Sequence, residues 1–301
     1  MLERKKRQAF SLIELSIVIL VIAILITGII QARNIINKFQ LQTARSLTNS
    51  SPALSIKGLE LWLETTSLDS FSGAYPDNLD RISLWRDLNA QSSTKNDATQ
   101  SNSSLRPYFY ENVINGLPGI YFAPGTRQIL NGTYPINAKN LATGSFSFFL
   151  VAVSNESVNF QTAFDTGVWN SSGWAFNKLM SSYNSKLRFI FCKTSCIPYD
   201  TPSLAPNNVI QIYSATNDDS KKLWFYINGT QIYTATNLNI IPNSTLGYKV
   251  GNDQSWINAL GSAAWRGYIG EIIVYNRFLK ADERKSIEQY LSQKWKVRIW
   301  V

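Results

Sequence analysis

The first fifty residues fall into zones of sharply different polarity. Four basic residues at positions 4–7 are followed by Gln8 and Ala9, and a stretch of eighteen uncharged residues then runs over positions 15–32. At about 1.5 Å per residue, a helix of eighteen residues spans roughly 27 Å, close to the hydrocarbon core of a bilayer. The pattern predicts a transmembrane helix whose amino end is held in the cytoplasm by the basic cluster.

Glu14 is a lone carboxylate at the start of this apolar stretch. An ionised carboxylate in a membrane is costly unless a cation pairs with it, so we expect Glu14 to have a positively charged partner. Two simpler interpretations fit less well. A secretory signal peptide has its small-residue cleavage site after the apolar core, whereas Ala9 precedes the core here. An uncleaved signal anchor fits the length but leaves Glu14 unexplained.

The helical pattern continues beyond the apolar stretch. Apolar residues recur at spacings typical of one helix face, with polar residues largely between them. A continuous helix over residues 10–47 would be about 57 Å long. The polar residues 48–51 and Pro52 end the pattern. The apolar positions of this second half are Ile35, Ile36, Phe39, Ala44 and Leu47.

The order of basic cluster, small residue, Phe10, Ser11, two aliphatic residues and Glu14 resembles the class III leader of bacterial type IV pilins and pseudopilins. The resemblance implies that a prepilin peptidase cuts after Ala9 and methylates the new amine of Phe10. It also implies that Glu14 meets the amino terminus of a neighbouring subunit during filament assembly. The chain departs from the family in having Ala9 where Gly is usual. No proline lies between Phe10 and Ser51, so Gly28 is the one candidate for a weak point.

Residues 53–301 show short apolar stretches every ten to fifteen residues, separated by polar loops, which predicts many short strands. Asn228-Gly229 between alternating apolar residues predicts a hairpin with a type I′ turn. A short helix is expected near the end, with Ile287 and Leu291 on one face and Arg284 one turn before Glu288. The predicted strands cover residues 58–63, 119–122, 145–153, 186–191, 208–214, 222–227, 231–234, 246–250 and 268–275.

A series of short motifs follows in order along this half of the chain, at residues 58–63, 85–88, 96–100, 106–107, 115–122, 224–229, 270–277 and 283–295. Their order resembles the laminin G-like, concanavalin A-like jelly rolls of bacterial surface proteins. The resemblance implies a mainly β fold with a long N-terminal α-helix: a pilin-type transmembrane helix followed by a concanavalin A-like β-sandwich, or jelly roll. In that family such domains bind glycans or proteins, some with calcium.

Catalytic signals are sparse. The chain has no histidine, which excludes Ser-His-Asp, Cys-His and His-ligated metal schemes. Glycoside hydrolysis needs two carboxylates facing one cleft, and the nearest acidic strand offers only Glu271. We therefore expect no enzymatic activity, no cofactor and no catalytic residues. Two loops carry adjacent residues with side-chain oxygens, Asp218-Asp219 and Asn252-Asp253. These oxygens could bind calcium, although such pairs are more often solvated turn residues.

Two further residue sets bear on the surface of the head. Cys192 and Cys196 are the two cysteines, and in a domain outside the cytoplasm we expect them to form a disulfide around a short loop. Among the nine tryptophans, Trp62, Trp224 and Trp295 lie in strand or helix patterns and are expected in the core. The candidates for an exposed ligand-binding platform lie near Gly, Ser and Asn: Trp169, Trp174, Trp256 and Trp265.

The formal charge of +9 includes +3 from residues 1–9, so the mature chain carries +6 from its side chains. This mild charge fits acidic glycans, DNA or anionic lipid surfaces without choosing among them, and no nucleic-acid-binding motif is present. We expect no specific nucleic-acid partner.

Together these patterns divide the chain into a cleaved leader at residues 1–9, a pilin-type helix at 10–52 and a jelly-roll head at 53–301. They predict a type IV pilin-like subunit, of the minor or tip kind, that presents its head for adhesion or recognition. Expected partners are the prepilin peptidase, other pilin subunits and a glycan or protein ligand. The expected location is the inner membrane and then a surface filament. The alternatives are a type II secretion pseudopilin, a membrane-tethered carbohydrate-active enzyme and a signal-anchored lectin.

Overall fold

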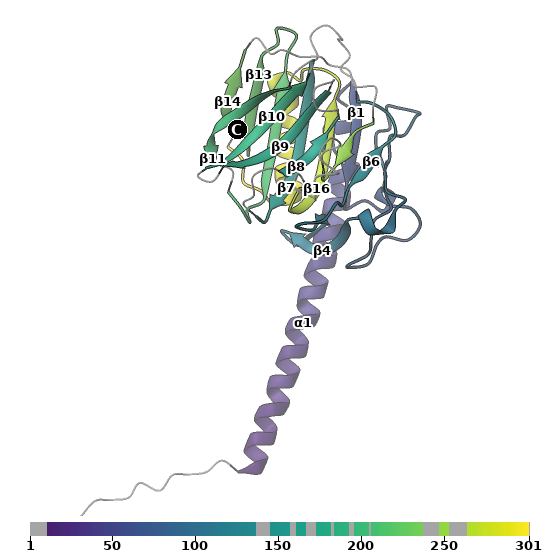
Figure 1. Ribbon diagram of the computed structural model, residues 1–301. Coiled ribbons are helices and arrows are strands. Elements are labelled where there is room, and N and C mark those ends of the chain that lie inside the picture. The colour runs from purple at the N-terminus through teal and green to yellow at the C-terminus, as the bar shows by residue number, and fades with distance from the viewer. Residues whose placement is uncertain are drawn as a thin grey trace, which may run out of the picture.

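A single unbroken helix, α1 (Leu12–Asn49), leads into the head, as the sequence predicts. The computed structural model describes residues 11–136, 145–156, 161–166, 173–181, 184–192, 196–204, 206–236, 247–252 and 264–300. The helix continues through Gly28 without interruption, and α1 projects from the head as one rod (Figure 1). Ser50 caps its end, and Ser51 begins a short 3₁₀ turn, Pro52–Leu54.

The head is a sandwich of two antiparallel sheets, which confirms the predicted β-sandwich. The first sheet has the order β14-β13-β12-β7-β16-β5-β4, with β1 also paired to β16. The second has the order β11-β10-β9-β8-β15-β6-β3-β2. The first sheet contains β1 (Leu59–Glu64), β4 (Tyr108–Ile114), β5 (Leu117–Phe122), β7 (Phe146–Ser154), β12 (Gln211–Asn217), β13 (Leu223–Ile227), β14 (Thr230–Ala235) and β16 (Gly267–Tyr275). The second contains β2 (Leu84–Trp85), β3 (Ala98–Thr99), β6 (Leu130–Gly132), β8 (Gln161–Asp165), β9 (Gly173–Ser181), β10 (Asn184–Cys192), β11 (Cys196–Leu204) and β15 (Lys249–Val250).

All nine predicted strands are present, with ends that shift by a few residues. The predicted hairpin at Asn228-Gly229 joins β13 to β14, and both residues have the positive φ of a type I′ turn, 49° and 78°. The predicted C-terminal helix is α2 (Ala281–Trp295), with Ile287 and Leu291 buried and an ion pair between Arg284 and Glu288. Local hydrophobic patterning therefore predicts most elements of the head.

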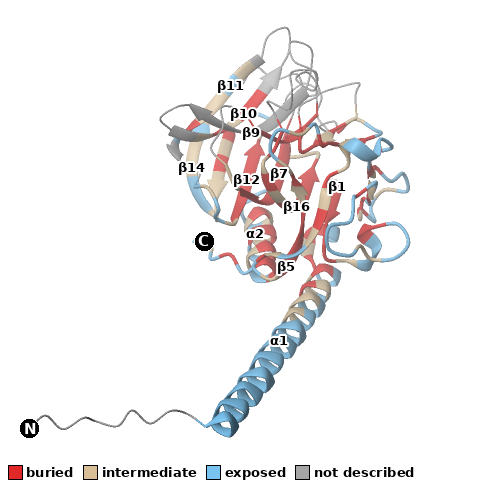
Figure 2. Ribbon diagram, turned by 60° about the horizontal axis from the view of Figure 1, so that its bottom comes forward, coloured by how far each residue is buried: buried red, intermediate tan, exposed pale blue. Residues whose placement is uncertain are grey.

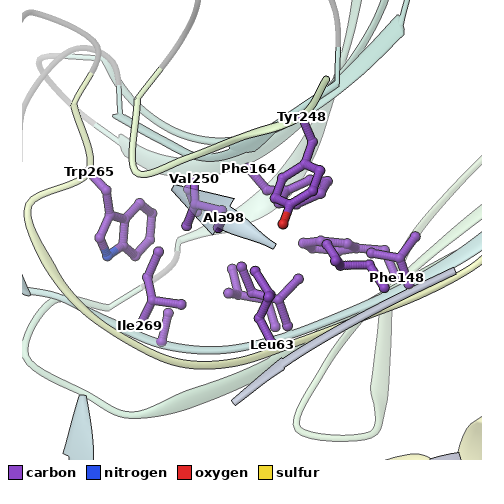
Figure 3. Packing of buried hydrophobic residues seen from close by; sticks show 14 of the residues in the cluster. Leu63, Ala98, Phe148, Phe164, Tyr248, Val250, Trp265 and Ile269 are labelled. Atoms are coloured by element: carbon purple, nitrogen blue, oxygen red, sulfur yellow. The ribbon is translucent and has the colours of Figure 1, made fainter. Parts of the chain in front are cut away.

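Two hydrophobic clusters hold the head together. The larger lies between the sheets, where Phe148 and Phe164 meet across the gap with ring centroids 5.4 Å apart (Figure 3). The smaller lies between the outer face of the first sheet and α2, and it extends to Ala44 near the end of α1. Figure 2 shows the consequence for α1, which is exposed over most of its length and buried only where it meets the head. The helix is thus anchored at one end and free of the head along the rest.

Candidate assembly helix and its junction with the head

The amino end of α1 is built around Ser11 and Glu14. The Glu14 backbone N–H donates to Ser11 Oγ at 3.2 Å, and the Ser11 backbone N–H donates to Glu14 Oε2 at 2.8 Å. This reciprocal pair is a capping box, which satisfies two N–H groups that the first helical turn would otherwise leave without partners. The Glu14 carboxylate is exposed and turned toward the amino terminus of its own helix. The cleavage-site residues Ala9 and Phe10 lie outside the described residues.

Most of the apolar surface of α1 is exposed and contacts none of the residues whose positions the structure describes. Among the described residues, one helical segment is long and apolar enough to cross a membrane: Leu12–Leu54, which comprises α1 and the short 3₁₀ turn after it. Its most apolar stretch of 18 residues is not buried at all. The exposed apolar surface continues past Arg33 to Phe39, whose side chain is 64% exposed. The helix therefore presents an apolar surface longer than the head can cover, which suits burial first in lipid and then against other helices.

The carboxyl end of α1 docks on the head through a mixture of apolar and polar contacts. Ala44 and Thr48 are buried, and Arg45 Nε donates to the backbone oxygen of Thr66 at 2.8 Å. The Arg45 guanidinium also lies over the Tyr75 ring, 4.9 Å from its centroid. These contacts fix the direction in which the free part of the helix leaves the head.

Gln40 meets the tip of the β4–β5 hairpin at Gly116. A Cβ atom at Gly116 would lie 2.1 Å from Gln40 Oε1, and Gly116 has φ of +83°, which other residues rarely adopt. The hairpin can approach the helix this closely because position 116 has no side chain. The contact makes the tip of the hairpin part of the helix support.

Gly116→Ala is expected to destabilise the head by about 1–3 kcal/mol, chiefly through backbone strain at a φ of +83°, with a smaller part from displacing the flexible end of the Gln40 side chain. Thermal unfolding of the purified chain measures the loss. The matched control is Gly73→Ala, since Gly73 has φ of +79° and nothing within 4 Å of the added Cβ atom. Equal losses in the two variants would show that the Gln40 contact contributes nothing.

A buried charge cluster lies beneath the junction. Lys294 Nζ contacts Glu64 Oε2 at 2.7 Å and Glu271 Oε2 at 2.9 Å, and all three side chains have 0% exposure. Burial alone would raise the pKa of Glu64, but the Lys294 charge and hydrogen bonds from Lys294 and Thr66 hold that pKa below its ordinary value. The cluster joins the end of β1, the middle of β16 and the end of α2 at the base of the head.

Glu271 is a structural residue of this cluster. Its carboxylate accepts hydrogen bonds from Trp62 Nε1 and Trp295 Nε1, both at 2.7 Å, and from the Tyr290 hydroxyl at 2.8 Å. The enzyme alternative depended on Glu271 facing a glycan, whereas the structure buries Glu271 completely. No local sequence pattern predicts Glu64 and Lys294 as partners of Glu271, because only the pairing of β1 with β16 and the packing of α2 bring them together.

The tryptophan predictions are partly wrong. Trp265 is fully buried between the sheets, as Figure 3 shows, because the strand that follows it carries the chain into the core. Trp169 and Trp256 lie outside the described residues, and Trp174 is placed only as a backbone position in β9. Of the three expected core tryptophans, Trp62 and Trp295 are buried. Trp224 is partly exposed beside Lys222, whose ammonium lies 4.9 Å from the ring centroid.

The remaining predicted sites stay predictions. The β10–β11 hairpin makes Cys192 and Cys196 direct Cα partners, and their side chains lie outside the described residues, so the disulfide is untested. Asp218 Oδ1 accepts three hydrogen bonds from Ser220 and Lys222 and closes a turn. In the part of the chain that the structure describes, no cluster of three or more His, Cys, Asp or Glu residues could hold a metal ion. Calcium binding therefore has no further support from the described residues.

Comparison with known proteins identifies the amino-terminal segment. Residues 4–30 match the prokaryotic N-terminal methylation motif, which confirms the class III leader. The matched residues cover the basic cluster and the apolar first half of α1, and a segment of this kind is typical of pilin- and pseudopilin-like proteins anchored in the inner membrane. No curated protein sequence matches the chain.

Several solved β-sandwich structures are similar to the head at low identity. A carbohydrate-binding module, CBM40, of the Ruminococcus gnavus IT-sialidase, bound to α2,3-sialyllactose, is 15% identical, with a TM-score of 0.40 over 55% of this chain and 92% of the module. The Trypanosoma rangeli sialidase in complex with the inhibitor DANA is 14% identical, with a TM-score of 0.48 over 89% of this chain and 39% of the sialidase. A Limulus polyphemus pentraxin is 13% identical, with a TM-score of 0.38 over 54% of this chain and 81% of the pentraxin chain. Similarity at this level gives no information about ligand or activity.

Proposed function

We propose that this protein is a type IV pilin-like filament subunit, cleaved after Ala9, whose α1 packs in a filament and whose head faces outward for adhesion or recognition. The observation that carries the proposal is the exposed apolar surface of α1 with Glu14 at its amino end. Lipid covers this surface before assembly, and the helices of other subunits cover it in the filament. Once the leader is removed, the new amine of Phe10 supplies the cation that Glu14 needs.

The size of the head favours a minor or tip subunit over a repeating major one. A sandwich of two eight-stranded sheets is bulky beside a single helix. The alternative of a type II secretion pseudopilin keeps the same helix and differs in the machine that assembles it. Detection of the protein in sheared surface pili supports the pilus proposal, whereas a secretion defect without surface filaments supports the pseudopilin alternative.

We further propose that the head is not catalytic. The hydrolase alternative depends on the strand carboxylate of Glu271. This carboxylate forms an ion pair with Lys294 and accepts hydrogen bonds from Trp62, Tyr290 and Trp295. A glycan-turnover assay with the purified chain tests this proposal, and release of reducing ends above the background of a buffer control would contradict it.

Ala9→Leu is expected to block cleavage, because the peptidase of this class requires a small residue before the cut. The uncleaved chain then stays in the inner membrane, and filaments lack it. Immunoblots of membranes and sheared filaments measure both effects. The matched control is Ala9→Gly, which restores the usual residue and is expected to be processed at least as well as the natural chain. Normal leader removal from Ala9→Leu would show that a different enzyme makes the cut.

A further inference from the structure

Three tyrosines form a continuous aromatic surface on the outer face of the first sheet. Tyr110 on β4, Tyr121 on β5 and Tyr268 on β16 have ring centroids 4.9–5.7 Å from one another. Each alternates along its strand with a residue of the core between the sheets, namely Phe109, Ile120 and Ile269. The three rings therefore point away from that core.

Tyr268 lies at the edge of the cluster that α2 forms with the outer face of the first sheet. The last residue of α2, Trp295, reaches β16 at Gly270, where an added Cβ atom would lie 2.6 Å from the Trp295 ring. Tyr268 lies two residues before this point, next to the end of the covered region, and all three tyrosines are partly exposed. Gly119 leaves room for Tyr268 on the neighbouring strand, since a Cβ atom at position 119 would lie 3.3 Å from the Tyr268 Cβ atom. Tyr110 packs edge-on against the other two rings, and the Tyr121 ring is tilted by 37° from the Tyr268 ring. We call this partly exposed cluster the tyrosine platform: Tyr110, Tyr121 and Tyr268.

The platform carries hydrogen-bonding groups as well as apolar surface. None of the three hydroxyl groups has a hydrogen-bond partner among the described residues. Burial raises the pKa of the Tyr121 hydroxyl, and Tyr110 and the Glu156 carboxylate raise that pKa further, so the hydroxyl stays protonated at neutral pH and can donate. Glu156 itself pairs with Arg266 at 2.7 Å, and Arg266 directly precedes the first residue of β16. Aromatic faces with free hydroxyls and a nearby ion pair suit a ligand that is apolar on its faces and rich in hydroxyl groups at its edges.

The size of the platform favours a small ligand. A fully buried aromatic side chain covers about 150–250 Å², so three partly exposed rings offer on the order of 200 Å² in total. A stable protein interface buries about 800 Å² on each partner, which is several times more. A few linked sugar rings match both the extent and the chemistry of the surface.

We propose that the tyrosine platform is a binding site for a pyranose oligosaccharide, which stacks on the rings of Tyr121 and Tyr268 and bonds to their hydroxyls. This inference rests on the proposed function, because it assumes that the head is delivered to the outside of the cell. A single shallow site of this kind binds weakly, and a filament that carries several copies would raise the effective affinity through multivalency.

The test uses the full-length chain, purified in detergent, on an array of immobilised pyranose oligosaccharides that includes chitohexaose, cellohexaose, maltohexaose and sialylated glycans. The natural chain is expected to bind at least one of them. Tyr121→Ala and Tyr268→Ala are each expected to weaken that binding about tenfold, in line with the loss of one stacked ring. Tyr121→Phe keeps the ring and should lose less. The matched control is Tyr134→Ala, since Tyr134 is 48% exposed and lies outside the platform.

Three outcomes would overturn the proposal. One is the absence of binding to any glycan on the array, and another is an equal loss of binding in Tyr134→Ala and Tyr121→Ala. Unchanged glycan binding in both platform variants, together with loss of filaments, would instead identify the platform as a contact between subunits and would also overturn it. The unfolding midpoint of each variant confirms that the fold is intact. Glycan binding is measured on the unassembled chain, so its failure is distinguishable from a failure of the filament proposal.

Discussion

Glu14→Ala is expected to leave cleavage after Ala9 and membrane insertion intact while lowering incorporation into filaments about tenfold or more. In the natural chain the Glu14 carboxylate is exposed at the start of α1 and has the Ser11 backbone N–H as a hydrogen-bond donor. The variant leaves the incoming Phe10 amine of a neighbour without an anion in a surrounding of low polarity. Quantitative immunoblotting of sheared filaments against the membrane pool measures the change.

A pair of controls separates charge from helix capping at this position. Glu14→Gln keeps an oxygen that can accept from the Ser11 N–H but loses the negative charge, so its incorporation should fall as far as that of Glu14→Ala. Ser11→Ala removes the hydroxyl that accepts from the Glu14 N–H and leaves the carboxylate in place, so its incorporation should stay close to that of the natural chain. The reverse ranking would mean that Glu14 acts through the helix cap and not through an intersubunit ion pair.

Lys294→Met is expected to lower the free energy of unfolding of the head by about 3–5 kcal/mol, because it leaves Glu64 and Glu271 buried without their shared cation. The neutral side chain is close in size to lysine, so the loss comes mainly from charge. The change also removes the ammonium that lies beneath the α1 junction. Denaturant-induced unfolding, followed by tryptophan fluorescence, measures the difference.

The matched control for this cluster is Lys296→Met. Lys296 is exposed and lies two residues further along the chain, directly after α2, so its loss should change the free energy of unfolding by less than about 0.5 kcal/mol. If Lys294→Met is equally harmless, the two carboxylates are held by their other hydrogen bonds, from Thr66, Trp62 and Trp295, and the cation is dispensable.

The sequence predicts what is encoded in local patterns. Helix α1 and the strands with alternating or continuous apolar residues are found as expected, and Asn228-Gly229 forms the expected turn. Strands with weak local signals were not predicted, among them β8 and β11. Strand β11 carries Pro198 and Pro202. These prolines are tolerated because β11 is an edge strand of its sheet.

Features that depend on long-range packing could not be predicted in the same way. Trp265 lies near Gly261 and Ser262 in the sequence, which favours a loop, yet tertiary packing places it in the core between the sheets. Glu64 and Lys294 are far apart in the chain and meet only because β1 pairs with β16 and α2 packs across the same sheet. The tyrosine platform left a partial signal: Tyr108-Phe109-Tyr110 alternates as an edge strand would, with both tyrosines on one face.

The amino terminus of the protein recovered from filaments tests the central claim most directly. Mass spectrometry of the intact chain should give the mass of residues 10–301 plus one methyl group, and fragmentation should place that methyl group on the amine of Phe10. A chain that still begins at Met1, or one found only as dispersed copies in the inner membrane, would contradict the account.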